Sequence, residues 1–117
     1  MTQTHRPAPV GRYGLLQDFE NQDLSVRILR MDEGDEAIGR HVHQRCAQVY
    51  VVLQGYVAVE RSGKTVELGP YEVASVGAGV PHSARPLGGP AVVMNISTPP
   101  LAADDQIPEL GPITGSP

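Results

Sequence analysis

Turn-forming residues divide this chain into short segments, and their spacing constrains the fold more than any other feature. Clusters rich in Gly and Pro recur along most of the sequence, at the interval of about eight to twelve residues that is typical of all-β sandwiches and barrels. Between them, residues of contrasting polarity alternate, so that the segment 24–31 presents two different faces. No apolar stretch with helical period exceeds about two turns. The sequence therefore predicts an all-β sandwich or barrel.

The expected strands can be placed between the turns. They occupy residues 24–31, 37–43, 48–54, 56–61, 65–68, 72–76, 82–87 and 91–98. A chain of 117 residues has the size of one domain, and we expect residues 1–117 to form one, with its core at about 24–98. Residues 1–11 are predicted to be a loose arm. Residues 99–117 are rich in proline. This composition predicts an extended tail that packs over the rest of the domain or is partly disordered.

Composition excludes several classes of function. The net charge is −4 and the nine basic residues are scattered, which argues against a nucleic-acid partner. No stretch approaches the roughly 18 apolar residues of a membrane helix, and the first twenty residues lack the apolar core of a signal peptide. The single cysteine, Cys46, excludes an internal disulfide and fits a reducing compartment. We therefore expect a cytoplasmic protein with no membrane partner.

Three histidines carry the strongest functional signal. His41 and His43 are two residues apart, so on a strand they share one face. Gln48 opens the next expected strand, and His82 begins another after the turn at 77–81. Three imidazoles and one amide oxygen brought together inside a barrel would bind one divalent transition metal, with Zn, Fe, Ni and Mn as candidates.

The spacing of these residues resembles that of small single-domain cupins of the conserved-barrel type. The first cupin motif, G-x5-H-x-H-x(3,4)-E-x6-G, is matched from His41 through Gln48 to Gly55, with Gln in the place of Glu and no Gly at the leading position. In the second motif, G-x5-P-x-G-x2-H-x3-N, Gly79 and His82 match. The first Gly, the Pro and the Asn are replaced by Tyr71, Gly77 and Pro86.

The resemblance implies a cupin double-stranded β-helix, or jelly-roll barrel, over residues 24–98. It also implies that the metal ligands are His41, His43, Gln48 and His82. Because all four would be uncharged, the site would keep the full charge of the ion and favour anionic or enolate-forming ligands. Two alternatives remain: Gln48 hydrogen-bonds a metal-bound water, or the site has lost its metal and only binds a ligand or packs.

Further residues are expected near the site. Tyr50 shares a face with Gln48 and either places its phenol near the metal or packs at the barrel mouth. Asn95 either orients a ligand or satisfies a neighbouring backbone group. Arg85 follows His82 on the same strand and is expected to share its face, where it would clamp a carboxylate or lie solvated at the rim. Cys46 is expected to be a small packed residue, with a reactive thiol as the alternative.

Three functions are compatible with this site. The first is a lyase or isomerase that stabilises an enolate of a small oxygenated acid or sugar, because the ligand set is similar to that of the cupins that open unsaturated uronates from pectin and alginate. Asn95, however, stands where the resemblance implies an acidic residue, which argues against uronate ring opening itself. The second is a three-His Fe(II) dioxygenase, with Val52, Val76, Val93 and Met94 as an apolar lining. The third is a non-catalytic binding module for a small molecule.

The resemblance also implies a partner. Small cupins generally pair through strands of their N-terminal sheet, and residues 13–16 and 24–31 could supply such an edge. We expect a homodimer; the alternative is a monomer whose tail covers the edge.

Overall fold

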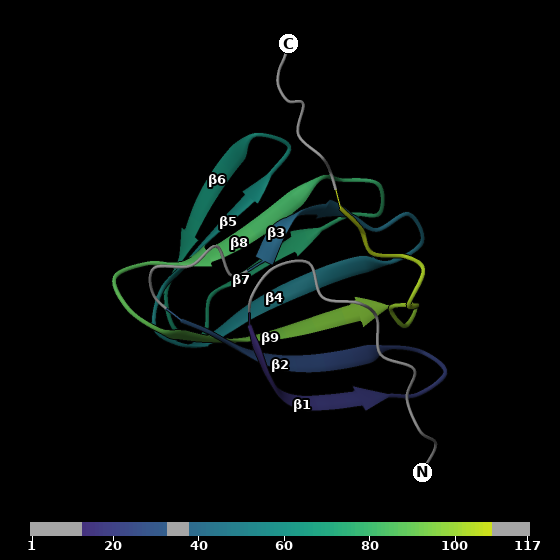
Figure 1. Ribbon diagram of the computed structural model, residues 1–117, viewed down its shortest axis with the longest axis horizontal. Coiled ribbons are helices and arrows are strands. Elements are labelled where there is room, and N and C mark those ends of the chain that lie inside the picture. The colour runs from purple at the N-terminus through teal and green to yellow at the C-terminus, as the bar shows by residue number, and fades with distance from the viewer. Residues whose placement is uncertain (1–12, 33–37, 109–117) are drawn as a thin grey trace.

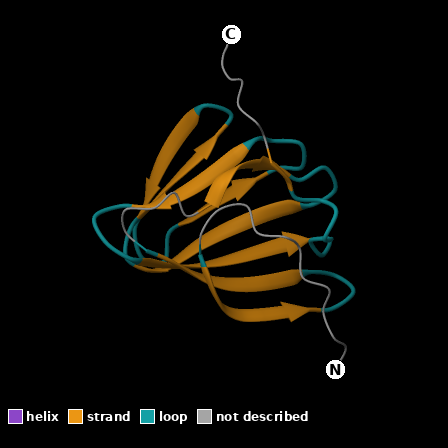
Figure 2. Ribbon diagram, in the orientation of Figure 1, coloured by secondary structure: helices purple, strands orange, loops and turns teal. Residues whose placement is uncertain are grey.

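The computed structural model describes residues 13–32 and 38–108, which form ten strands (Figure 1). The strands are β1 (Gly14–Glu20), β2 (Ser25–Met31), β3 (Ile38–Val42), β4 (Ala47–Gln54), β5 (Val57–Arg61), β6 (Lys64–Leu68), β7 (Val73–Val76), β8 (His82–Pro86), β9 (Ala91–Thr98) and β10 (Ile107–Pro108). Figure 2 shows that this part of the chain consists of strands and loops. Within it there is no helix with the length and apolarity that crossing a membrane requires.

The strands form two five-stranded antiparallel sheets that face each other (Figure 1). The first sheet has the order β1-β2-β9-β4-β7, and the second has the order β10-β3-β8-β5-β6. Strands from both halves of the sequence therefore lie next to each other in each sheet. This is the jelly-roll, or double-stranded β-helix, architecture that the sequence predicts.

Side-chain alternation explains why the sheets face each other. In β9 every second residue from Ala91 to Ser97 is buried, and β2 buries Ser25, Arg27, Leu29 and Met31 in the same way. Period-two burial turns one side of each strand toward the opposite sheet. The apolar core between the sheets contains Val52 and Val93 from the first sheet and Val57 and Val59 from the second.

The predicted strands agree with the observed ones to within one or two residues, and the predicted range 91–98 coincides with β9. Gly55, which closes the first motif, ends β4 with a φ of 82°, and a Cβ atom there would lie 2.6 Å from the carbonyl oxygen of Pro90. Only glycine fits this turn without strain. The predicted arm at 1–11, residues 33–37 around the start of the second predicted strand, and the end of the predicted tail at 109–117 lie outside the described residues.

Two features of the periphery go beyond the prediction. The start of the tail returns to the barrel, where Leu101 is buried and β10 pairs with the end of β3. β1 is longer than the edge segment at 13–16 that the sequence indicated, and it forms the border of the first sheet with Leu16 and Phe19 exposed. The homodimer expected at this edge stays a prediction.

Candidate metal centre

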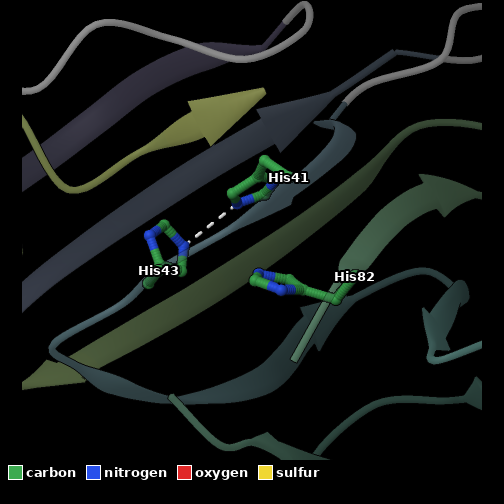
Figure 3. Close-up of side chains that lie close together, drawn as sticks. All are labelled: His41, His43 and His82. Carbon is green, nitrogen blue, oxygen red and sulfur yellow. Dashed lines mark hydrogen bonds between the residues drawn. The ribbon is translucent and has the colours of Figure 1, made fainter. Parts of the chain in front are cut away.

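The three histidines of the motif meet between the two sheets (Figure 3). His41 belongs to β3 and pairs directly with His82 at the start of β8. His43 follows β3 and faces the same space. One ring nitrogen from each residue lies within 4.8 Å of the others, and all three side chains are almost completely buried. The strand periodicity that placed His41 and His43 on one face is thus what brings the rings together.

Each imidazole is held by a backbone carbonyl through its Nδ1 atom. His41 Nδ1 lies 2.6 Å from the oxygen of Gly39, His43 Nδ1 lies 2.7 Å from that of Asp105, and His82 Nδ1 lies 3.0 Å from that of Val80. Because a carbonyl oxygen can only accept, each Nδ1 carries the proton and donates it. Each Nε2 is then unprotonated in the neutral ring. This arrangement is typical of histidines whose other nitrogen binds a metal.

The unprotonated nitrogens point at one another. His41 Nε2 and His43 Nε2 are 3.0 Å apart, the contact drawn in Figure 3. Burial lowers the pKa of His41 to about 3 and that of His82 to about 4, and it lowers the pKa of His43 as well. At neutral pH no ring therefore carries the second proton that a hydrogen bond between them needs. Two lone pairs face each other, and a cation between them is the arrangement that satisfies both.

The spacing fits a transition metal. Two nitrogens that each lie about 2.1 Å from a metal and subtend a right angle are about 3.0 Å apart, which is the distance between His41 Nε2 and His43 Nε2. The donor chemistry also fits, since neutral imidazoles suit Zn, Fe and Ni. The residues present can therefore hold the one divalent ion that the sequence predicts.

Gln48 lies beside this cluster on β4 and is almost completely buried. Its Nε2 donates to Ser97 Oγ at 2.8 Å, and its Oε1 lies 3.2 Å from His82 Nε2. Ser97 in turn contacts Asn95 Oδ1 at 3.3 Å. The hydroxyl thus orients the amide so that its oxygen, the atom a metal would bind, faces the histidines.

Two loops are tied together at the cluster. The N–H of Gly79, whose φ of 80° suits glycine, donates to the carbonyl of His43 at 2.7 Å, so the turn before His82 is joined to the loop after β3. The carboxylate of Asp105 accepts from the N–H groups of Gln44 at 2.7 Å and Arg45 at 3.0 Å. The tail therefore holds the loop that carries His43.

Of the other residues predicted near the site, Tyr50 and Asn95 lie beside the histidines and Arg85 does not. Tyr50 and Asn95 are buried and line the pocket beside the histidines. Tyr50 is fully enclosed rather than at the barrel mouth, and its ring lies edge-on to His82. Burial raises the pKa of the Tyr50 phenol far above its usual value, so the phenol keeps its proton.

The expectation that Arg85 shares the face of His82 is wrong, whereas its alternative, a solvated side chain, agrees with the structure. Arg85 lies three positions after His82, so the period of two turns it to the opposite face of β8, where it is exposed. It lines no part of the pocket around the histidines. Cys46 is buried, and burial, together with Asp105, raises the pKa of its thiol to about 11. This favours the predicted packed residue over a reactive thiol.

Three polar pocket residues were missed by sequence reasoning: Tyr13 before β1, Arg27 on β2 and Gln106 in the tail. They line the cavity together with two of the candidate metal ligands. Arg27 carried no distinguishing signal, because each face of β2 holds one arginine, Arg27 on one and Arg30 on the other. Gln106 and Asp105 carried none, because nothing in a proline-rich tail shows where it packs.

Comparison with known proteins agrees with this architecture. A family model described as the Cupin domain matches residues 27–97. Among solved structures, TT1209 from Thermus thermophilus is 26% identical, with a TM-score of 0.70 over 76% of this chain and 85% of that one. KdgF from Halomonas sp. is also 26% identical, with a TM-score of 0.64 over 74% of this chain and 76% of that one.

A third solved structure is less similar in sequence and supports only the assignment of the fold. A Klebsiella pneumoniae protein with a double-stranded β-helix domain is 20% identical, with a TM-score of 0.68 over 89% of this chain and 90% of that one. No curated protein matches the sequence.

Proposed function

This chain belongs to the cupin family, and from that premise we propose that it is a metal-dependent isomerase or lyase acting on a small oxygenated acid or sugar. The observation that carries the proposal is the convergence of three unprotonated Nε2 atoms whose rings are each fixed by a backbone carbonyl. Such preorganised nitrogens are costly to bury without a cation. A site of this kind supports metal binding better than packing alone.

Gln48 is proposed as the fourth ligand. In this orientation its Oε1 and the Nε2 of His82 are both acceptors at 3.2 Å, and a cation near both would satisfy them. The hydrogen bond from its amide nitrogen to Ser97 keeps the oxygen turned inward. With His41, His43 and His82 it makes a set of four neutral ligands, which leaves the charge of the ion undiminished.

The chemistry follows from that charge. A divalent ion in this site supplies Lewis acidity that stabilises negative charge developing on a carbonyl oxygen, as in enolate formation. The pocket adds a buried phenol, Tyr50, whose raised pKa keeps it protonated, so that it can donate a hydrogen bond to that oxygen. Asn95 is the cross-strand neighbour of Tyr50 and lines the same cavity.

The lining of the pocket separates this proposal from its alternatives. The apolar lining expected for a dioxygenase is not formed, because Val52, Val76 and Val93 are in the core and Met94 lies on the other face of β9. Most residues around the cavity are polar. Asn95 cannot carry a proton, so the proposal is enolate chemistry on a small acid or sugar and excludes uronate ring opening through a carboxylate on this strand.

Solvent-deuterium exchange tests the proposal without knowledge of the substrate. The protein, loaded in turn with Zn, Ni, Mn and Fe under nitrogen, is incubated in D2O with a panel of small 2-oxo acids and ketoses. Exchange next to the carbonyl is followed by NMR. We expect exchange that requires the metal and is lost in His41→Ala. Oxygen consumption by the iron form in a parallel incubation in air, without exchange under nitrogen, would instead support a dioxygenase. Absence of both reactions from a metal-loaded protein would support a binding module.

A further inference from the structure

Arg27 is a buried cation in the pocket that the proposed metal centre does not use. Its side chain belongs to β2 and is only 9% exposed. Among the residues that the structure describes, no carboxylate forms an ion pair with it. A buried guanidinium without an anionic partner is costly. Such a group is expected where a ligand supplies the missing charge.

The present partners of Arg27 are weak and neutral. Its Nη1 donates to the hydroxyl of Tyr13 at 3.4 Å and its Nη2 donates to Oε1 of Gln106 at 3.5 Å. Both distances exceed the usual range of about 2.7–3.2 Å for such bonds. The guanidinium also lies 6.0 Å from the centre of the Tyr13 ring, at the limit of a cation–π contact. An incoming carboxylate would replace these contacts with shorter, charge-assisted ones.

Strand register places Arg27 next to the metal ligands. Arg27 pairs with Asn95 on β9, and Asn95 pairs with Tyr50 on β4, so the three form one row across the inner face of the first sheet. The adjacent row contains Ser97 and Gln48. Arg27, Gln48 and His41 line the same cavity. A small ligand in this cavity would therefore meet both the guanidinium and the metal ligands.

The charge of the cavity favours an anion. A divalent ion on four neutral ligands and the guanidinium of Arg27 are both positive, and none of the described residues around the cavity is acidic. Asp18 on β1 pairs with Arg27 in the strand register but forms no ion pair with it. The buried carboxylate of Asp105 is turned to the backbone N–H groups of the loop after β3. The cavity measures about 10 Å³, room for one water molecule, so the ligand must be small and must displace Gln106 and Tyr13 from the guanidinium.

We propose that Arg27 binds the carboxylate of a small 2-hydroxy or 2-oxo acid whose second oxygen reaches the metal. This inference rests on the proposed metal centre and narrows its substrate class to acids rather than neutral sugars. Arg27 would orient the acid by a two-pronged hydrogen bond, the geometry in which a guanidinium recognises a carboxylate.

A binding measurement tests the proposal independently of turnover. Glycolate and its neutral analogue glycolamide are titrated into the Co(II)-loaded protein, and the visible absorption of the cobalt reports binding. Arg27→Gln should weaken glycolate by about tenfold or more, since a hydrogen bond to a charged group is lost. Arg27→Lys should recover part of the affinity. Arg30→Gln, which removes the same charge from the exposed face of β2, is the matched control and should bind as the wild type does.

Each outcome bears on a different claim. Loss of glycolate binding in Arg27→Gln, with glycolamide unaffected and cobalt still bound, supports the proposal. Equal glycolate affinity in Arg27→Gln and wild type overturns it and leaves the metal centre standing. An equal loss in Arg30→Gln, or a loss for glycolamide as well, also overturns it, because net charge or packing would then be the cause. Failure of the wild type to bind cobalt overturns the metal centre, and this inference with it.

Discussion

The two ends of the space between the sheets have opposite characters, although the same strands form both. At one end the rows across the first sheet are polar: Ser25, Ser97 and Gln48 form one row, and Arg27, Asn95 and Tyr50 form the next. At the other end they are apolar, with Leu29, Val93 and Val52 in one row. The second sheet repeats the division, since His41 pairs with His82 whereas Ile38 pairs with Ala84.

The same pair of sheets thus carries a stabilising apolar core at one end and the candidate site at the other. Alternation buries every second residue at both ends, so burial alone does not distinguish them. The apolar rows stabilise the folded state because their side chains are removed from water. The polar rows must be satisfied by hydrogen bonds, and the facing Nε2 atoms of His41 and His43 are left unfavourable until a cation binds. The account therefore predicts that the two ends respond differently to substitution.

The largest effect is expected at the apolar end. Met31 is fully buried on β2, and Met31→Ala should lower the free energy of unfolding by about 2–5 kcal/mol because it leaves a cavity. Metal affinity should stay within a factor of a few of the wild type, since the ligands lie at the other end. Urea denaturation of the metal-free protein and a metal titration measure the two quantities. A parallel loss of metal affinity would show that the ends are not independent.

The next effect concerns the hydroxyl that orients Gln48. Ser97→Ala removes the acceptor for the amide nitrogen of Gln48 and should weaken metal binding by about 10–100-fold, as loss of an outer-sphere partner does. Ser83→Ala, on the outer face of β8, is the matched control and should leave metal affinity unchanged. Unchanged affinity in both variants would mean that Gln48 is not a ligand.

The pH dependence of the metal-free protein gives a smaller, graded effect. Burial holds the pKa of His41 at about 3 and that of His82 at about 4, below the value of 6.5 in the unfolded chain. Between pH 6.5 and about 4 the unfolded state therefore binds protons that the folded state does not. The contribution of these two histidines to the free energy of unfolding is fully present above pH 6.5. As the pH falls below 6.5, it should decrease by up to about 1.4 kcal/mol per pH unit for each histidine.

Denaturation between pH 6.5 and 5, where most carboxylates stay ionised, measures this slope. His82→Gln should reduce it, because one of the depressed groups is gone. A stability that is flat across this window would contradict neutral, buried rings.

The smallest effect is expected on the outer face. Arg85 is exposed on the side of β8 away from the histidines. Arg85→Gln should therefore change stability by less than about 0.5 kcal/mol and leave metal and glycolate binding unchanged. A marked loss of glycolate binding would place Arg85 near the pocket after all.

Local patterns account for what the sequence predicted. Alternation and turn residues located the strands, and the spacing of His41, His43, Gln48 and His82 identified residues that the fold brings together. Arg85 lies an odd number of residues after His82, so it faces away from the histidines, and the expected shared face does not form. Arg27 was overlooked because an alternating strand does not itself show which face is inside. Asp105 and Gln106 could not be found, because their positions depend on tertiary packing of an irregular tail.

Metal content of this 117-residue chain separates a metal centre from three histidines that merely pack together. The protein is stripped with a chelator, incubated with Zn, Fe, Ni or Mn, dialysed and analysed by mass spectrometry of the elements, beside His41→Ala and the control Arg85→Gln. The account predicts about one equivalent of metal in the wild type and the control, and almost none in His41→Ala. A wild type that takes up none of these metals, or a His41→Ala variant that retains as much, would contradict it.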